Sequence, residues 1–170
     1  SRFFGSDPSI VLAGGGNTSC KIDDFLYVKG SGTALATMTR AGFVKMDRKK
    51  LSDLANATLD EDPETREAQC KQLISRARCE PEKGQRPSVE VLLHHLVPAR
   101  YVVHSHATIA NTLTCHAGGQ ALAEQIFGDD IVWVPYVDPG FILAQTLKQA
   151  LEEYRARTGR ELAKAILMAN

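Results

Sequence analysis

The 170-residue sequence has no surplus charge, few aromatic residues and no long apolar run. Its 20 Lys and Arg balance 20 Asp and Glu, and aromatic residues make up only 6% of the chain. A net charge of zero gives no overall electrostatic attraction to nucleic acid or to anionic lipid. No apolar stretch approaches the roughly 20 residues that a membrane-spanning helix requires. We therefore expect neither nucleic acid nor a membrane as partner, and a cytoplasmic location.

Cysteine is also sparse, since the four cysteines are widely spaced and no two form a CxxC pair. Neither a zinc finger nor a disulfide framework can be written from them, so we expect reduced cysteines with structural roles. The first residues lack the charged and apolar regions of a secretion signal. With 44% hydrophobic residues, a chain of this length is expected to form one globular domain over residues 1–170.

The apolar pattern predicts early hairpins followed by alternating helices and strands. Strands are expected at residues 9–12, 18–22, 25–29, 101–106, 131–137 and 165–169. Helices are expected after the N-caps Asp47, Asp62 and Ser88, and at residues 108–114, 120–127 and 139–157. Helical spacing predicts two buried helix faces. The Ser88 helix is expected to bury Val89, Leu92, Leu93 and Leu96, and the last helix to bury Ile142, Leu143, Leu147, Ala150, Leu151 and Tyr154. This order suits a sheet covered by helices, and it does not suit the regular βαβ repeat of a dinucleotide-binding fold.

His104-Ser105-His106 is the sharpest local motif. Two imidazoles two residues apart on a strand project from the same face, so both can reach one divalent metal ion. Glu90 lies 14 residues earlier, near the start of the Ser88 helix, and a short turn at Pro98 returns the chain towards the histidines. The alternatives are a packed histidine pair at a sheet edge and a glutamate that only complements the helix dipole.

Two glycine-rich turns, 14–16 and 30–32, flank neighbouring strands, so their tips can converge. Their backbone N–H groups, with nearby hydroxyl and amide side chains, suit a bound phosphate, although two ordinary hairpin turns explain them equally well. Neither turn matches the P-loop or the GxGxxG fingerprint. His94, His95 and His116 are weaker metal candidates, because helical histidines more often serve packing or solvent contact.

Four motifs, taken in order, resemble the class II aldolase/adducin family. They are Gly16-Asn17-Thr18-Ser19, Lys29-Gly30-Ser31-Gly32-Thr33, Pro87-Ser88-Val89-Glu90 and Val103-His104-Ser105-His106. Within the family the chain looks most like the domains of rhamnulose-1-phosphate aldolase type, including those fused to a short-chain dehydrogenase. The resemblance implies an α/β fold of three αβα layers, with a largely antiparallel central sheet covered by helices. It also implies a homotetramer and a dehydrogenase domain downstream in the same polypeptide.

The resemblance implies a role for each matching residue. Gly16, Asn17, Ser31, Gly32 and Ser88 would surround the substrate phosphate. His104 and His106, together with Glu90, would hold Zn²⁺ or another divalent metal, and Glu90 would be the catalytic acid/base. Such enzymes cleave a ketose 1-phosphate to dihydroxyacetone phosphate and an aldehyde through a metal-stabilised enediolate. Sugar-phosphate epimerases and dehydratases on the same scaffold, and a non-catalytic adducin-like interaction module, are the alternatives.

The sequence departs from the family pattern in two places. Val89 stands where the aldolases often have a second serine before the glutamate, which removes a hydroxyl from the expected phosphate site. The family's third metal histidine follows a late strand that residues 164–170 resemble, so we expect it after Asn170, with residues 1–170 forming a C-terminally truncated domain. We accordingly expect weak zinc binding and little activity from residues 1–170 alone.

Overall fold

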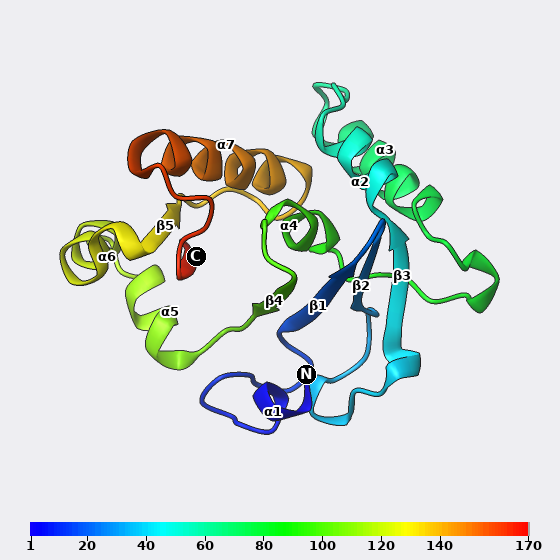
Figure 1. Cartoon of the computed structure of the whole chain (residues 1–170), viewed down its shortest axis with the longest axis horizontal. Helices are drawn as coiled ribbons and strands as arrows, with labels where there is room; N and C mark the ends of the chain where they lie inside the picture. The colour runs from blue at the N-terminus through cyan, green and yellow to red at the C-terminus, as the bar shows by residue number, and fades with distance from the viewer. Residues whose placement is uncertain (170) are drawn as a thin grey trace.

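The computed structural model describes residues 1–169 and contains two β-sheets linked by helices (Figure 1). The larger sheet has the strand order β3-β2-β1-β4 with every neighbouring pair antiparallel, whereas β5 and β6 form a parallel pair. The strands are β1 Asn17–Ile22, β2 Phe25–Lys29, β3 Phe43–Asp47, β4 Tyr101–His104, β5 Ile131–Val134 and β6 Ala165–Met168. The expected α/β class with a largely antiparallel sheet is therefore observed.

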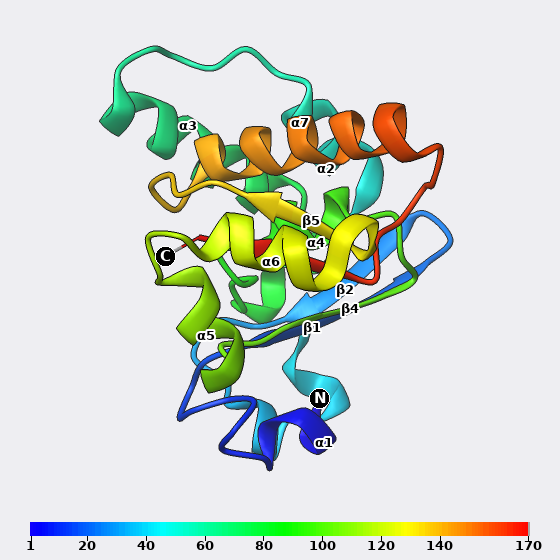
Figure 2. The same ribbon diagram turned by 90° about the vertical axis from the view of Figure 1, so that its left-hand side faces the viewer.

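Seven α-helices accompany these strands within residues 1–169. They are α1 Arg2–Gly5, α2 Arg48–Ala55, α3 Pro63–Arg76, α4 Val91–Leu96, α5 Thr108–Thr114, α6 Gly119–Phe127 and α7 Phe141–Thr158. In Figures 1 and 2, α4 lies between the larger sheet and α7, and it contacts α2, α7 and β2. No helix in this described part of the chain is both long and apolar enough to cross a membrane.

Several helix ends form where the sequence predicts them. The Asp47 side chain accepts a hydrogen bond from the backbone N–H of Lys50 at 3.1 Å, which caps α2. Asp62 caps α3 in the same way, accepting from the N–H of Thr65 at 2.9 Å. Gly159 ends α7 with φ +69°, a left-handed conformation that glycine adopts without a Cβ clash.

Other boundaries differ from the prediction. Residues 9–12 form no strand, because the backbone N–H groups of Ile10 and Val11 bond to the Asp7 carbonyl in a turn. The strand expected over 131–137 ends at Val134, before Pro135, which has no N–H to donate to a ladder. The strand expected over 101–106 ends at His104. Sequence analysis did not predict β3, although its burial alternates as a half-buried strand requires.

Two predicted helix faces agree with the structure except at their first apolar residue. The N-cap of α4 is Glu90 rather than Ser88, so Val91 is buried and Val89 is 80% exposed. In α7 the buried face includes Phe141, whereas Ile142 is 38% exposed. Leu92 and Leu93 of α4, and Leu147, Leu151 and Tyr154 of α7, are buried as predicted. Only the first apolar residue of each predicted face was wrong, because the neighbouring core and not the local pattern sets where each helix begins.

The hydrophobic core is continuous from the larger sheet to the β5–β6 pair. It joins Leu26 and Val28 of β2 to Leu51 of α2, Val91 of α4 and Leu147 of α7, each of them almost inaccessible to solvent. Helix α4 is packed within this core, so the residues at its two ends are held against fixed neighbours. This matters because Glu90 stands at its first end.

Candidate metal centre

Glu90, His104 and His106 converge at one point on the surface. Each offers one potential ligand atom, and these atoms all lie within 4.8 Å of one another. Glu90 is the N-cap of α4, His104 is the last residue of β4, and His106 lies two residues further, before α5. The two imidazole rings lie 5.0 Å apart and 27° from parallel, although the strand that was expected to align them ends at His104.

One oxygen of Glu90 carries the local hydrogen bonds. Its Oε2 lies 3.2 Å from Nδ1 of His104 and also accepts a hydrogen bond from the Asn17 side-chain amide. Burial by itself raises the pKa of Glu90, but the hydrogen bond and charge interaction with His104 outweigh burial and lower that pKa overall. Glu90 is therefore ionised at neutral pH, the state in which a carboxylate binds a cation or accepts a proton.

Strand β1 contacts both Glu90 and the strand that carries His104. Asn17 pairs with His104 in the β1–β4 register while its side chain reaches Glu90. Gly16, just before β1, has φ +70°, and a Cβ there would lie 2.9 Å from the carbonyl oxygen of His104. Only glycine combines this backbone conformation with so close an approach.

The residues expected at a phosphate lie on two neighbouring segments. The backbone N–H of Ser88 bonds to the Lys29 carbonyl at 3.0 Å, and that of Ser31 bonds to the Arg86 carbonyl at 2.8 Å, so the 30–32 turn lies beside the segment before Glu90. Ser88 Oγ is 3.3 Å from the N–H of Glu90. Because β1 and β2 are antiparallel, the turn before β1 and the turn after β2 lie at the same end of the hairpin. Ser31 and Gly32 are exposed there, whereas Gly16, Asn17 and Ser88 are buried.

The three other histidines of the chain do not join the centre. His94 is 1% exposed, and burial lowers its pKa to about 4; His95 has the same pKa direction and value, again chiefly through burial. Both are neutral at pH 7. His116 is exposed, and its Nδ1 accepts the N–H of Gly118 at 3.0 Å. The third metal histidine expected after Asn170 lies outside the described residues.

Sequence analysis missed a row of buried polar residues on β1. Ser19 bonds to His94, and the Lys21 ammonium bonds to three carbonyl oxygens near the end of α4. Burial, then the charge of Arg48, lowers the pKa of Lys21 to about 8, so the ammonium remains the main form at neutral pH. Residues 17, 19 and 21 share one face of a strand, but Thr18 between them is also polar, so the sequence pattern alone does not single out this face.

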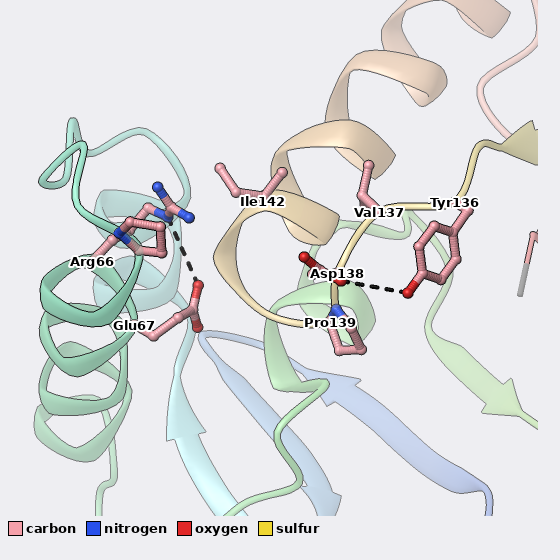
Figure 3. A pocket seen from close by; sticks show the side chains of 8 residues that line it. Arg66, Glu67, Tyr136, Val137, Asp138, Pro139 and Ile142 are labelled. Carbon is pink, nitrogen blue, oxygen red and sulfur yellow. Dashed lines mark hydrogen bonds and ion pairs between the residues drawn. The ribbon is translucent and has the colours of Figure 1, made fainter.

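Two surface hollows lie away from Glu90, His104 and His106. One of about 400 Å³ lies between the start of α3 and the loop before α7 (Figure 3). There Glu67 Oε1 accepts the backbone N–H of Phe141 at 3.0 Å, which caps α7, and Asp138 is the second carboxylate that lines the hollow. A second, of about 420 Å³, lies at the end of α4 and is lined by Lys21 and His95 among others. Neither hollow is lined by two histidines and a carboxylate, the set of side chains that converges at Glu90.

Comparison with known proteins identifies related sequences. The family model described as the class II aldolase and adducin N-terminal domain matches residues 2–170. An uncharacterized oxidoreductase of Bacillus subtilis (strain 168), YuxG, is 35% identical over 160 residues, which is 89% of this chain and 22% of that protein. The chain thus spans about a fifth of the length of this curated relative.

Solved structures with a similar fold include the N-terminal class II aldolase domain of a conserved protein from Thermoplasma acidophilum. It has a TM-score of 0.81 and 28% identity over 99% of this chain and 76% of that one. The L-fuculose-1-phosphate aldolase of Thermus thermophilus has a TM-score of 0.52 and 18% identity, covering 91% of this chain and 70% of that one. At that identity the second likeness concerns the fold alone.

Proposed function

The chain belongs to the class II aldolase and adducin family, and from this premise we propose that it is the aldolase domain of a zinc-dependent aldehyde-lyase. Its substrate would be a ketose 1-phosphate of the rhamnulose or fuculose type, cleaved to dihydroxyacetone phosphate and an aldehyde. The observation that carries the proposal is the convergence of Glu90, His104 and His106 within 4.8 Å. Adducin-type interaction modules have no need of such a donor set.

The donor set suits zinc. Two imidazole nitrogens and a carboxylate oxygen are ligand types that Zn²⁺ takes in catalytic sites, where one position stays open to substrate. His104 and His106 would hold the ion, with Glu90 at its side. Zinc bound there would polarise the ketose carbonyl and stabilise the negative charge that develops as the carbon–carbon bond breaks.

Glu90 would move the proton. Cleavage of the C3–C4 bond removes the proton of the C4 hydroxyl, releases the aldehyde, and leaves the electron pair at C3, which then takes up a proton. Within residues 1–169, Oε2 of Glu90 accepts the bonds of Asn17 and His104, so Oε1 is the oxygen available to the substrate. A lowered pKa keeps Glu90 ionised and ready to accept the proton before returning it.

The phosphate would bind beside this carboxylate. We assign it to Gly16, Asn17, Ser31, Gly32 and Ser88, because their segments meet at one end of the β1–β2 hairpin and both glycine turns contain residues with positive φ. The assignment is supported by the hydrogen-bonded contact between the 30–32 turn and the segment before Ser88.

We also propose that the domain works within a larger assembly. The far longer relative carries an oxidoreductase name, which supports a dehydrogenase domain downstream in the same polypeptide. A homotetramer would surround the open metal centre with residues of neighbouring subunits.

Elemental analysis tests the metal centre directly. The purified chain, alone and extended past Asn170, is compared with His104→Ala and with the control His116→Ala, in which an exposed histidine is removed. We expect roughly one zinc per extended wild-type chain, retained in the control and lost in His104→Ala. If neither wild-type form holds a divalent metal after zinc is supplied, the aldolase mechanism fails and a non-catalytic interaction module replaces it.

With zinc present, a panel of ketose 1-phosphates identifies the reaction. We expect release of dihydroxyacetone phosphate, measured by enzymatic reduction. Conversion of the sugar phosphate without that product would instead identify epimerisation or dehydration on the same scaffold.

A further inference from the structure

We propose that Ser19, Lys21 and His94 are positioning residues that fix α4 on β1 and thereby set Glu90 against His104. The inference rests on the proposed roles of Glu90 and His104 at the metal centre. None of the three would touch substrate or metal. Their function would be to hold the helix that carries the acid/base at one position along the strand.

The first observation is that alternate residues of β1 bond to successive points along α4. Asn17, Ser19 and Lys21 alternate along β1, so they share one face of the strand, and each is at most 9% exposed. Their side chains bond to successive points of the α4 segment. Asn17 reaches Glu90 at its start, Ser19 reaches His94 one turn later, and Lys21 reaches its end. Three side chains of one strand thus hold the helix along its whole length.

Lys21 holds the end of the helix and the turn that follows it. Its Nζ donates to the carbonyl oxygens of His94 at 2.7 Å, Val97 at 2.6 Å and Ala99 at 2.9 Å. An ammonium group has three N–H donors, so all three are used. A cation is also favourable at the negative end of a helix dipole. Lys21 is therefore committed to the α4–β4 connection and has no donor left for a ligand.

His94 links the helix to the histidine strand. Its Nδ1 lies 2.8 Å from Ser19 Oγ, and its ring lies 6.5 Å from the His104 ring at 25° from parallel. Strand β1 pairs with β4 through Asn17 and His104, so β1 is bonded both to the helix of Glu90 and to the strand of His104. The relative position of those two groups is consequently determined on β1.

Hydrogen bonds from β1 are needed to position α4 because the helix has only six residues. Isolated helices of that length are unstable in water, so tertiary contacts must define where the helix lies. Misplacement of a catalytic group by about 1 Å is enough to reduce the rate by roughly a hundredfold. Apolar packing alone tolerates small sliding of a helix, whereas directed hydrogen bonds to specific atoms do not.

Three variants test the proposal. Lys21→Met removes the donors and keeps the apolar stem, Ser19→Ala removes one hydroxyl, and Val132→Ala is the control, a core truncation in β5, which contacts β6, α6 and α7. Urea unfolding measures stability, and Co²⁺ titration measures the dissociation constant and the visible spectrum of the bound ion. Crystal structures of the metal-free proteins measure the contact between Glu90 and His104.

We expect Lys21→Met and Ser19→Ala to weaken Co²⁺ binding by roughly tenfold or more and to change its spectrum while the protein is still folded. Val132→Ala should lose stability and keep wild-type Co²⁺ affinity and spectrum. The proposal would be overturned if Ser19→Ala kept wild-type Co²⁺ affinity and an unchanged Glu90–His104 contact. If Lys21→Met does not fold, Ser19→Ala alone decides.

The outcome separates this inference from the proposed function. If the wild-type chain extended past Asn170 binds no Co²⁺, the metal centre is contradicted, and the metal-free crystal structure of Ser19→Ala decides the positioning role. A displaced Glu90 carboxylate supports that role, whereas an unchanged one overturns it.

Discussion

Glu90 is a residue whose two carboxylate oxygens have different surroundings. Oε2 accepts a hydrogen bond from Asn17 of β1 and lies 3.2 Å from Nδ1 of His104 of β4, whereas no hydrogen bond to Oε1 is found within residues 1–169. A carboxylate that is held by one oxygen and free at the other is well suited to a proton transfer that must recur at one position.

Glu90→Gln should separate proton transfer from metal binding. The amide keeps the shape of the side chain but cannot accept and return a proton, so we expect kcat to fall by roughly 10²–10⁴-fold. His104 and His106 remain, so zinc content should persist. The measurement is steady-state cleavage together with elemental analysis, with Glu124→Gln on α6 as control. Complete loss of zinc would instead make Glu90 chiefly a ligand.

Val89→Ser tests phosphate recognition. Val89 is 80% exposed next to Glu90, so the substitution should leave stability within about 0.5 kcal/mol of wild type. One new hydrogen bond contributes about 1 kcal/mol, so KM for a phosphorylated ketose should fall roughly fivefold. An unphosphorylated analogue is the control and should show no change. Equal effects on both substrates would place the phosphate elsewhere.

At the scale of elements, the two glycine turns differ in how much space they leave for a side chain. Gly16 and Gly32 both have positive φ, at +70° and +81°, so alanine is strained at either position. A Cβ at Gly32 would meet nothing within 4 Å, whereas at Gly16 it would meet the His104 carbonyl at 2.9 Å. Gly16 of the first turn therefore lies tightly against the backbone of His104, whereas Gly32 of the second turn has no such close neighbour.

Gly16→Ala and Gly32→Ala form a matched pair. Each should lose about 1–2 kcal/mol of unfolding free energy from the backbone alone. Gly16→Ala should lose more, because β1 or β4 must shift, and it should also weaken zinc binding. Urea unfolding and zinc calorimetry measure the two effects. Equal losses of stability with equal zinc affinity would show that the close approach to His104 is unimportant.

For the whole molecule, two buried neutral histidines link stability to pH. The pKa of both His94 and His95 is about 4, compared with 6.5 for an unperturbed histidine. Between these values the unfolded chain binds more protons than the folded one, so the free energy of unfolding rises with pH. Stability is complete above about pH 6.5 and is progressively lost as pH falls towards 4.

Urea unfolding at pH 7, 5.5 and 4.5 measures this loss. His94 by itself should account for about 2 kcal/mol between pH 7 and 4.5. His94→Gln should be less stable at pH 7 but show a shallower decline, while His116→Ala should keep the wild-type slope. A stability that is constant from pH 7 to 4.5 would contradict the buried, neutral state of His94.

The sequence by itself determined those features that depend on interactions between nearby residues. The caps of α2 and α3, the glycine end of α7 and the β1–β2 hairpin follow from interactions within a few residues of each position. The His104 and His106 pair could be identified because residues two apart remain neighbours even where the strand ends. Motif order along the chain also indicated the family, since it needs no coordinates.

Only the tertiary structure decided which distant residues meet. Asn17 and Glu90 are 73 residues apart, and their contact depends on the packing of α4 against β1. The same packing buried Val91 rather than Val89 and made Lys21 a buried cation bonded to the end of α4. A short helix has too little intrinsic preference to fix its own boundaries, so the core and the polar face of β1 fixed them instead.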